Sequence, residues 1–252
     1  MPAYDFRSPR LFLEAPLTAG AQLPLDRAQA HYLTTVLRRK PGDGVLVFNG
    51  RDGEWSAALA VQKRAAALVV DAKTRDQTAP ADLHYLFAPL KSARQDYMVQ
   101  KAVEMGASSL QPVLTRFTQV SRVNGERMRA NVIEAAEQCG ILSIAEVAEP
   151  MALDRYLGQR DQQRMLIFCD EAAEVMGPIQ ALQSGLTSDG IDVLIGPEGG
   201  FAEEERAILL RQPRTLRLSL GPRVLRADTA AVAALALVQA VLGDWAGPQK
   251  AG

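Results

Sequence analysis

Two segments near the C-terminus have residue types that could bind a ligand and act on it. Residues 193–201 read VLIGPEGGF, and residues 218–229 read LSLGPRVLRADT. In each segment a short apolar run, as expected of a buried parallel strand, ends at a Gly-Pro pair and continues into a helical pattern. Open α/β sheets bind ligands outside the carboxyl ends of such strands. The two segments therefore predict a ligand site with a floor of backbone amides and carbonyls.

The charges around these segments narrow the class of ligand. Neither segment has the Lys-Ser or Lys-Thr of a phosphate loop, and neither matches the G-x-G-x-x-G pattern of a dinucleotide site. Glu203, Glu204 and Glu205 follow the first segment, and carboxylates in the first turn of a helix repel an anion. The site therefore suits a neutral or cationic ligand with an adenine and a polar tail, a description that S-adenosylmethionine fits. If the segments were only tight connections between strands and helices, Arg223 and Arg226 would have no explanation.

The composition is ordinary for a globular protein. The 252 residues are 48% apolar and 23% charged, enough for two modest domains or one large one. No apolar run is as long as a membrane helix, and the N-terminus lacks a signal-peptide core. Cys139 and Cys169 lack metal-ligand spacing, as do His31 and His84. We therefore expect a cytoplasmic protein that binds no metal and no membrane.

The N-terminal part has the pattern of a small β-barrel. Turn sequences at 41–44 and 49–53 separate β-rich runs, and a helix capped by Asp26 is expected to run to about Arg38. The polar, proline-containing residues 76–82 read as a linker. Residues 1–130 hold 18 Lys and Arg against 12 Asp and Glu, whereas residues 131–252 hold 10 against 17, so the basic half suggests a polyanionic partner. Strands are expected at 10–13, 45–49, 54–60 and 66–73.

Apolar strand patterns alternate with amphipathic helix patterns over residues 83–245, and a short tail, 246–252, follows. This alternation indicates an α/β fold, a mostly parallel sheet with helices on both faces. The last helix, 228–243, is apolar on nearly every side, so it is either the central helix of the domain or also packs against a second subunit. The expected strands are 83–88, 109–113, 165–169, 192–195 and 215–220, and the other expected helices are 92–105, 126–138, 172–183 and 202–211.

The two Gly-Pro segments, 195–200 and 220–226, resemble the signature of the RsmE family. Three further segments match that family in the same order, so the resemblance covers nearly the whole chain; they are 31–39, 100–106 and 137–140. RsmE proteins are S-adenosylmethionine-dependent methyltransferases of the SPOUT (trefoil-knot) class. They act on N3 of a uridine in 16S rRNA of the small ribosomal subunit.

The resemblance implies a domain organisation and an oligomeric state. It places a PUA-like β-barrel RNA-binding domain at 1–75 and a SPOUT methyltransferase domain with a C-terminal knot at 83–245. The family assembles as dimers with the knotted regions facing each other. We therefore expect a homodimer formed through the knotted domain.

The resemblance also implies catalytic roles. Uracil N3 must lose a weakly acidic proton before it attacks a methyl group. Arg226 is expected to stabilise the developing negative charge on the ring carbonyls, and the carboxylate of Asp228 could accept the proton. Glu198 could hydrogen-bond the cofactor or a positioned base, or only bind local amides in a turn. Asp228 could equally cap the last helix, and the family usually has glutamate there. The residues expected to bind the cofactor are Leu194, Gly196, Pro197, Glu198, Gly199, Gly200, Leu218, Leu220, Gly221, Leu225, Arg226 and Thr229.

Basic residues in both domains are expected to contact RNA. Lys91, Arg94 and Lys101 share one helix face because spacings of three and seven align side chains, although a solvated basic face is the commoner explanation. The family motif at 137–140 is followed by Ile141 instead of the usual arginine, which weakens the case for an RNA contact there. The expected RNA-binding residues are Arg10, His31, Arg38, Arg39, Lys91, Arg94, Lys101 and Arg116.

Two other functions fit part of the pattern. A SPOUT RNA methyltransferase that acts on the ribose 2′-oxygen would share the knot but would need no base deprotonation. A non-catalytic RNA-binding ribosome assembly factor would use only the barrel and the basic helix. The intact loops at 196–200 and 220–226 argue against the second alternative, because a protein that only binds RNA does not need a cofactor floor.

Overall fold

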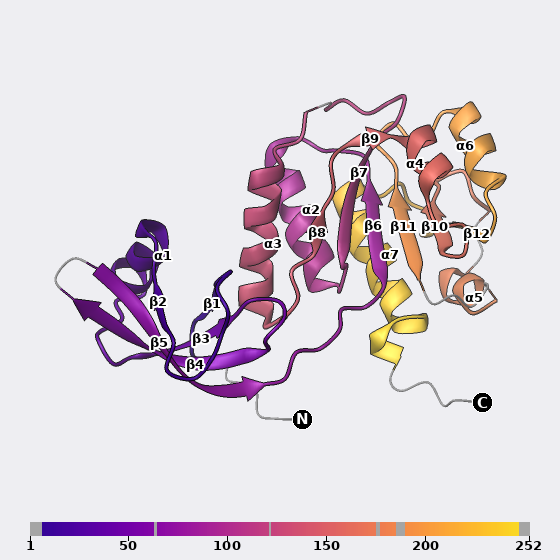
Figure 1. The fold of residues 1–252 in the computed structure, drawn as a ribbon. Coiled ribbons are helices and arrows are strands. Elements are labelled where there is room, and N and C mark those ends of the chain that lie inside the picture. The colour runs from indigo at the N-terminus through magenta and orange to yellow at the C-terminus, as the bar shows by residue number, and fades with distance from the viewer. Residues whose placement is uncertain (1–6, 63–64, 121, 175–176, 185–189, 247–252) are drawn as a thin grey trace. The chain divides into compact units, whose positions relative to one another are not determined.

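The computed structural model describes residues 7–62, 65–120, 122–174, 177–184 and 190–246, and the chain divides into two compact units (Figure 1). The first unit contains the residues up to Ala79 together with Ala136–Ile144. The second contains Pro80–Ala135 and the residues from Ala145 onward. Residues 136–144 thus fold with the N-terminal part of the chain, which the sequence did not indicate.

A five-stranded sheet forms the first unit. Its strands lie in the order β1-β3-β4-β5-β2, with β1 parallel to β3 and the other pairs antiparallel. Alternate residues of a strand point to the same face, so that Val45, Val47 and Leu59 contribute to a common core. The strands are β1 (Arg10–Phe12), β2 (Gln22–Pro24), β3 (Gly44–Phe48), β4 (Glu54–Gln62) and β5 (Ala65–Arg75).

A short helical segment joins β2 to β3. Helix α1 (Arg27–His31) begins after Asp26, whose side chain accepts a hydrogen bond from the Gln29 amide at 2.8 Å, and this confirms the predicted cap. The chain continues as the π-helical turn η1 (Tyr32–Val36). All four predicted strands are present, whereas β2 was not predicted because three residues are too few to show an alternating pattern.

Residues 136–144 are held in the first unit by specific contacts. The Phe12 amide donates to the Glu137 carboxylate at 2.8 Å, and the Arg75 guanidinium donates to the Gly140 carbonyl at 3.0 Å. Phe48 and Leu142 pack in one apolar cluster. Part of the motif that matched the RsmE family therefore has a structural role.

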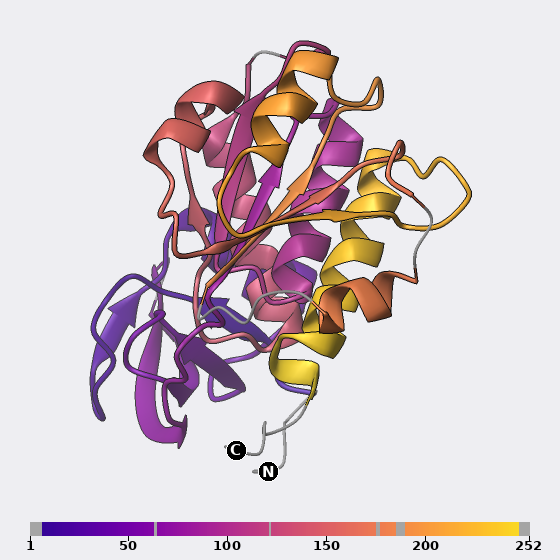
Figure 2. The same ribbon diagram turned by 90° about the vertical axis from the view of Figure 1, so that its right-hand side faces the viewer.

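A seven-stranded sheet forms the second unit, and all its pairings are parallel. The order is β12-β10-β11-β6-β7-β8, and β9 pairs with β7 outside this path. Helices α2 and α7 cover one face, and α4 and α6 cover the other, as Figures 1 and 2 show. The strands are β6 (Leu83–Phe87), β7 (Ser109–Leu114), β8 (Glu146–Val147), β9 (Met151–Ala152), β10 (Met165–Cys169), β11 (Ile191–Ile195) and β12 (Thr215–Leu218). The helices are α2 (Ser92–Glu104), α3 (Gly125–Cys139), α4 (Leu153–Gln159), α5 (Pro178–Gln183), α6 (Glu203–Leu210), α7 (Ala227–Val241) and the 3₁₀ turn η2 (Asp244–Ala246).

The predicted parallel sheet with helices on both faces is confirmed, with one wrong helix boundary. The helix expected from residue 172 begins only at Pro178, and residues 171–173 form a turn. Proline has no amide hydrogen to donate, so it is tolerated at the first position of a helix and not in its interior. Residues 175 and 176 lie outside the described part of the chain. The two-residue strands β8 and β9 and helix α4 were not predicted.

Helix α7 is the apolar helix expected at the C-terminus, and only part of its surface is buried. Ala231, Ala234, Leu235 and Val238 are buried, and α7 packs against α2. The intervening apolar residues, Val232, Ala233, Ala236 and Leu237, are only half-buried. Within the described ranges, none of the helices has both the length and the apolarity needed to cross a membrane.

Candidate functional site

The loops that follow β10, β11 and β12 enclose a cavity of about 330 Å³ at the carboxyl edge of the sheet. We call it the cofactor cavity. Because β12, β10 and β11 are neighbours in the parallel sheet, their carboxyl ends meet at one place. The lining consists of Cys169, Asp170, Glu171, Ile195, Gly196, Pro197, Glu198, Gly199, Gly200, Phe201, Leu220, Gly221, Pro222, Arg223, Val224, Leu225, Ala227 and Ala230.

Two glycines in the β11 loop allow this shape. Gly200 has a φ of +70°, in the region that favours glycine, and a Cβ there would collide with the Glu171 carboxylate. A Cβ on Gly196 would lie 2.9 Å from the ring of Phe201, which is buried against Phe168 in the core. The loop therefore exposes its backbone to the cavity without side chains in between.

The loop after β10 brings acidic and thiol groups to the cavity wall. Asp170 is buried and accepts hydrogen bonds from Arg206 at 3.1 Å and from Arg217 at 2.9 Å, so its charge is matched inside the protein. Glu171 pairs with Arg206 at 2.9 Å but keeps 45% of its side chain exposed. Desolvation and the charge of Asp170 raise the pKa of the Cys169 thiol to about 12, so this thiol is protonated and unreactive at neutral pH.

The structure brings together eight of the twelve residues expected to bind the cofactor. The other four do not line the cavity because of where they lie in the fold. Leu194 and Leu218 are fully buried within their strands, while Arg226 and Thr229 are exposed at the start of α7. The eight that line the cavity are Gly196, Pro197, Glu198, Gly199, Gly200, Leu220, Gly221 and Leu225. The β10 loop was missed, although two carboxylates directly after an apolar strand could have indicated it.

The three candidate catalytic residues have different surroundings. Glu198 forms an ion pair with Arg94 of α2 and lines the cofactor cavity. Asp228 accepts a hydrogen bond from the Thr229 amide at 2.9 Å, a local contact within the first turn of α7. Arg226 is the N-cap residue of α7, and among the residues that the structure describes its side chain has no hydrogen-bond or ion-pair partner. Arg226 is therefore available to a ligand.

The basic residues expected to contact RNA divide into exposed and internally paired groups. Lys101 donates to Glu104 at 2.6 Å and lies 5.6 Å from the centre of the Tyr97 ring. Arg10 is only 7% exposed and donates to Glu54 at 2.9 Å, so it stabilises the first unit from within. The exposed residues are His31 and Arg38 in the first unit and Lys91 and Arg116 in the second, and Arg39 is half-buried.

Two protein-family models match this chain. Residues 77–239 match the RNA methyltransferase domain family, and residues 25–71 match the RNA methyltransferase PUA domain family. A protein of Synechocystis called ribosomal RNA small subunit methyltransferase E is 30% identical, over 93% of this chain and 76% of its own length. The chain belongs to the ribosomal RNA small subunit methyltransferase E family. A member from Rickettsia conorii is 29% identical over 91% of this chain and 94% of its own length.

Solved structures agree with this family. The Neisseria gonorrhoeae ribosomal RNA small subunit methyltransferase E, bound to S-adenosyl methionine, aligns with a TM-score of 0.80 and 26% identity over 95% of this chain and all of its own. A putative methyltransferase from Legionella pneumophila, in complex with the bound cofactor SAM, aligns with a TM-score of 0.79 and 29% identity over 93% of this chain and 98% of its own. The resemblance to RsmE and the predicted fold, a SPOUT domain preceded by a PUA-like domain, are confirmed.

Proposed function

We propose that the chain transfers a methyl group from S-adenosylmethionine to N3 of a uridine in 16S rRNA of the small ribosomal subunit. The observation that carries this proposal is the cofactor cavity, whose lining is mainly the two Gly-Pro loops. Membership in the ribosomal RNA small subunit methyltransferase E family supports the RNA substrate. The cofactor bound in the Neisseria and Legionella structures supports S-adenosylmethionine.

The cofactor cavity fits S-adenosylmethionine in size and charge. Its volume, about 330 Å³, falls in the usual range for small-molecule sites, roughly 300–1,000 Å³. A flat adenine can approach the backbone closely at Gly196 and Gly199, which have no side chains. Glu171 and Glu198 put carboxylates on the wall, which favours a cationic sulfonium over an anion. When bound, S-adenosylmethionine supplies an electrophilic methyl group.

Residues of the chain then have to make uracil N3 nucleophilic. Of the three candidate catalytic residues, Glu198 alone lines the cofactor cavity, so its carboxylate is the group placed to accept the N3 proton. Asp228 already accepts the Thr229 amide and does not line this cavity. We therefore assign the proton transfer to Glu198 and a local role in the first turn of α7 to Asp228.

Arg226 supplies the positive charge that stabilises the deprotonated uracil. Its two neighbours in the chain, Leu225 and Ala227, both line the cofactor cavity, so the Arg226 backbone lies at the rim. An arginine at a helix N-terminus opposes the helix dipole and therefore does not serve the helix. A guanidinium at this rim stabilises the negative charge that spreads onto O2 and O4 of the uracil as N3 loses its proton.

The first unit supplies further RNA contacts. The match to the PUA domain family includes His31, Arg38 and Arg39. Arg38 has a φ of +54° and projects from the turn after η1, where it is exposed. These residues and Lys91 and Arg116 of the second unit form the proposed RNA-binding set, whereas buried Arg10 does not belong to it.

The half-buried apolar stripe on α7 supports a homodimer formed through the second unit. A helix that is apolar on nearly every side requires cover on every side, and α2, α5 and β11 together leave Val232, Ala233, Ala236 and Leu237 of α7 half-buried. Because the proposed substrate is part of the ribosome, we place the protein in the cytoplasm.

The test is to incubate the protein with S-adenosylmethionine and small ribosomal subunits from a strain that lacks the endogenous gene. Mass mapping of nucleosides should find 3-methyluridine at one position. A 2′-O-methylated nucleoside would establish the ribose alternative. RNA binding without methyl transfer, under conditions where calorimetry shows no S-adenosylmethionine binding, would establish the non-catalytic alternative.

A further inference from the structure

A second cavity, of about 280 Å³, lies beside the cofactor cavity at the carboxyl edge of the same sheet. It is built by the segments that follow β6, β7 and β11. The two cavities share Pro197 and Glu198 of the β11 loop, so this loop is their common wall. The second cavity is lined by Pro89, Leu90, Lys91, Ala93, Arg94, Phe117, Gln119, Val120, Pro197 and Glu198.

The strand order explains this arrangement. In the sheet, β11 lies between β10, which contributes to the cofactor cavity, and β6, which contributes to the second cavity. Methyl transfer requires donor and acceptor to meet within bonding distance, so an acceptor site has to adjoin the donor site. The second cavity meets this requirement, since it shares a wall with the cofactor cavity and that wall carries Glu198.

The residues of the second cavity suit a flat, partly polar ring. Phe117 is 46% exposed although it is a large apolar residue, so one face of its ring is available for stacking. The exposed Gln119 amide has both a donor and an acceptor, and within the described residues it has no hydrogen-bond partner. Pro89, Leu90 and Val120 provide apolar walls.

The segment that carries Phe117 is firmly held. The Thr115 amide donates to the Thr118 hydroxyl at 2.9 Å, and the Thr118 amide donates to the Thr115 carbonyl at 3.1 Å. The Arg116 amide donates to Glu205 of α6 at 2.8 Å. These hydrogen bonds hold the turn in place, so the Phe117 ring does not have to pack in the core and can point outward.

Basic groups lie at the same cavity. Lys91 is exposed at the N-terminus of α2, and Arg94 pairs with Glu198 across the wall that separates the two cavities. A nucleotide whose base enters the second cavity would bring its phosphate within reach of such cations. The combination of an open aromatic face, a free amide and adjacent cations matches a single unstacked nucleotide.

We propose that the second cavity receives the uracil to be methylated, with Phe117 stacked on its face and Gln119 hydrogen-bonded to its edge. The proposal rests on the proposed function for the identity of the base. An enzyme that acts on a base has to take it out of the stack, and a base in this cavity would lie beside the wall that carries Glu198. Phe117 and Gln119 are thus substrate-binding residues that neither the Gly-Pro loops nor the family motifs pointed to.

A cross-linking experiment tests the contact directly. The parent protein is irradiated with 16S rRNA transcribed with 5-iodouridine, and the cross-linked peptide is identified by mass spectrometry. We expect a cross-link within residues 117–120. Cross-links confined to other segments would overturn the proposal. This readout does not depend on turnover, so a parent protein that makes no 3-methyluridine but cross-links here would contradict the proposed function and leave the base site standing.

Kinetics of variants give the second test. Phe117→Ala should lower kcat/KM for RNA by about tenfold or more, the scale of one lost base stack, while Phe117→Tyr should stay near the parent. The Kd for S-adenosylmethionine, measured by calorimetry, should remain within about twofold. Leu210→Ala, a change at another exposed apolar side chain that lines neither cavity, is the control.

Two outcomes would count against the site. If Phe117→Ala keeps the parent kcat/KM for RNA, no stacking occurs there. If it loses cofactor affinity in the same proportion, Phe117 serves only to support Gly199, whose added Cβ would lie 3.3 Å from the Phe117 Cβ. Gln119→Ala provides an independent variant and should reduce kcat/KM for RNA without changing the cofactor Kd.

Discussion

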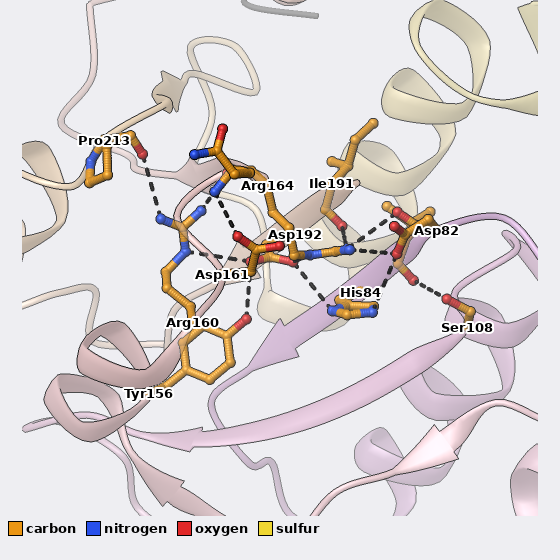
Figure 3. A network of polar contacts seen from close by, with 12 residues as sticks. Asp82, His84, Ser108, Tyr156, Arg160, Asp161, Arg164, Ile191, Asp192 and Pro213 are labelled. Carbon is orange, nitrogen blue, oxygen red and sulfur yellow. Dashed lines mark hydrogen bonds and ion pairs between the residues drawn. The ribbon is translucent and has the colours of Figure 1, made fainter. Parts of the chain in front are cut away.

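The two edges of the parallel sheet in the second unit use charge in opposite ways. At the amino edge, several charged side chains gather around the buried Asp192 and form ion pairs with it (Figure 3). At the carboxyl edge, loops open two cavities, and apart from Asp170 the charged side chains that line them are exposed or half-buried. The amino ends of these strands therefore lie at a network of polar contacts, and their carboxyl ends lie at the cavities that could bind ligands.

Asp192 is the centre of the amino edge. It is the second residue of β11 and has no exposed surface. Arg164 donates to it at 2.6 Å and the Tyr156 hydroxyl donates at 3.1 Å, while His84 Nδ1 lies 3.4 Å and Arg160 Nε 3.5 Å away. Burial opposes its charged form, but hydrogen bonds from His84 and Arg164 outweigh burial and lower the pKa of the Asp192 carboxyl.

At the carboxyl edge, Asp170 is buried and paired in the same way, but the other charged side chains that line the two cavities are exposed or half-buried. The Arg94–Glu198 pair has 40% and 44% of its two side chains exposed, and Arg226 has no partner within the described residues. Exposed ion pairs contribute little to stability, so these residues are better explained by what they meet from outside. We infer that buried, paired charges stabilise the scaffold, whereas exposed charges at the cavities are available to bind a ligand.

The largest effect is expected from removing the charge at the amino edge. Asp192→Ala leaves buried Arg160 without its carboxylate and leaves half-buried Arg164 with only Asp82, and breaking a buried pair in this way costs about 3–5 kcal/mol of unfolding free energy. Urea titration measures the loss. Glu204→Ala, at an exposed carboxylate in the first turn of α6, is the control and should cost less than about 1 kcal/mol. A loss at Asp192 no larger than in the control would contradict the scaffold role.

The same residue also sets a pH dependence. Because the folded-state pKa of Asp192 is lowered, its contribution to stability is present above the unfolded-state pKa, near 3.9, and is lost as the pH falls through the folded value. Asp192→Asn should therefore show a shallower loss of stability in acid than the parent. The cofactor Kd of the folded variants should be unchanged, because the other edge of the sheet binds the ligand.

At the carboxyl edge the largest effect is expected from Arg226. Arg226→Ala should cut methyl transfer by about a hundredfold or more, the scale of one lost preorganised donor, with cofactor affinity within a few-fold and stability nearly unchanged. Higher pH should recover part of the loss, because hydroxide can then remove the N3 proton. Arg226→Lys should recover less than charge alone suggests, since lysine lacks the planar fork.

A control sharpens this prediction. Arg211→Ala removes an exposed arginine at the end of α6 that lines neither cavity, and it should leave the rate unchanged. Full activity in folded Arg226→Ala would remove this residue from the mechanism and leave Glu198 as the acting group.

A smaller effect is expected from the floor of the cofactor cavity. Gly199→Leu places a bulky side chain against Phe117 in the loop that lines the cofactor cavity, so calorimetry should find S-adenosylmethionine binding weakened by about tenfold or more. Gly158→Leu is the matched control, because a Cβ there meets nothing within 4 Å. Equal affinities of the two folded variants would mean that the ligand does not touch this loop.

The sequence predicted the carboxyl edge better than the amino edge for a physical reason. Gly196–Gly200 and Leu220–Arg226 are local signals, since strand, turn and helix start follow one another within a few residues. The Asp192 network has no local signal, because Arg164 and His84 reach Asp192 from distant positions in the chain. Sequence patterns alone do not show which charges will be buried together.

The same limit explains the errors in the site. Arg10 looked like an exposed cation, yet it pairs inside the first unit with Glu54, 44 residues away. Phe117 and Gln119 lie in a turn without glycine, proline or motif, and only the strand order brings them next to the β11 loop. Residues that reach the site only because of the strand order could not be predicted from their spacing in the sequence.

The smallest effect is expected from two arginines of the first unit, exposed Arg38 and half-buried Arg39, and it tests whether cations that are unpaired within the described residues bind RNA there. Arg38→Ala with Arg39→Ala should weaken RNA binding and lower the slope of log Kobs against log salt by up to about 1.4 to 1.8, because up to two phosphate contacts, each about 0.7–0.9, are lost. The control is Lys101→Ala, at a lysine that already pairs with Glu104, and it should change the slope much less. A double variant with the parent slope would show that Arg38 and Arg39 are only a solvated surface. If Lys101 instead changed the slope as much as both arginines together, internal pairing would not distinguish scaffold cations from RNA-binding ones.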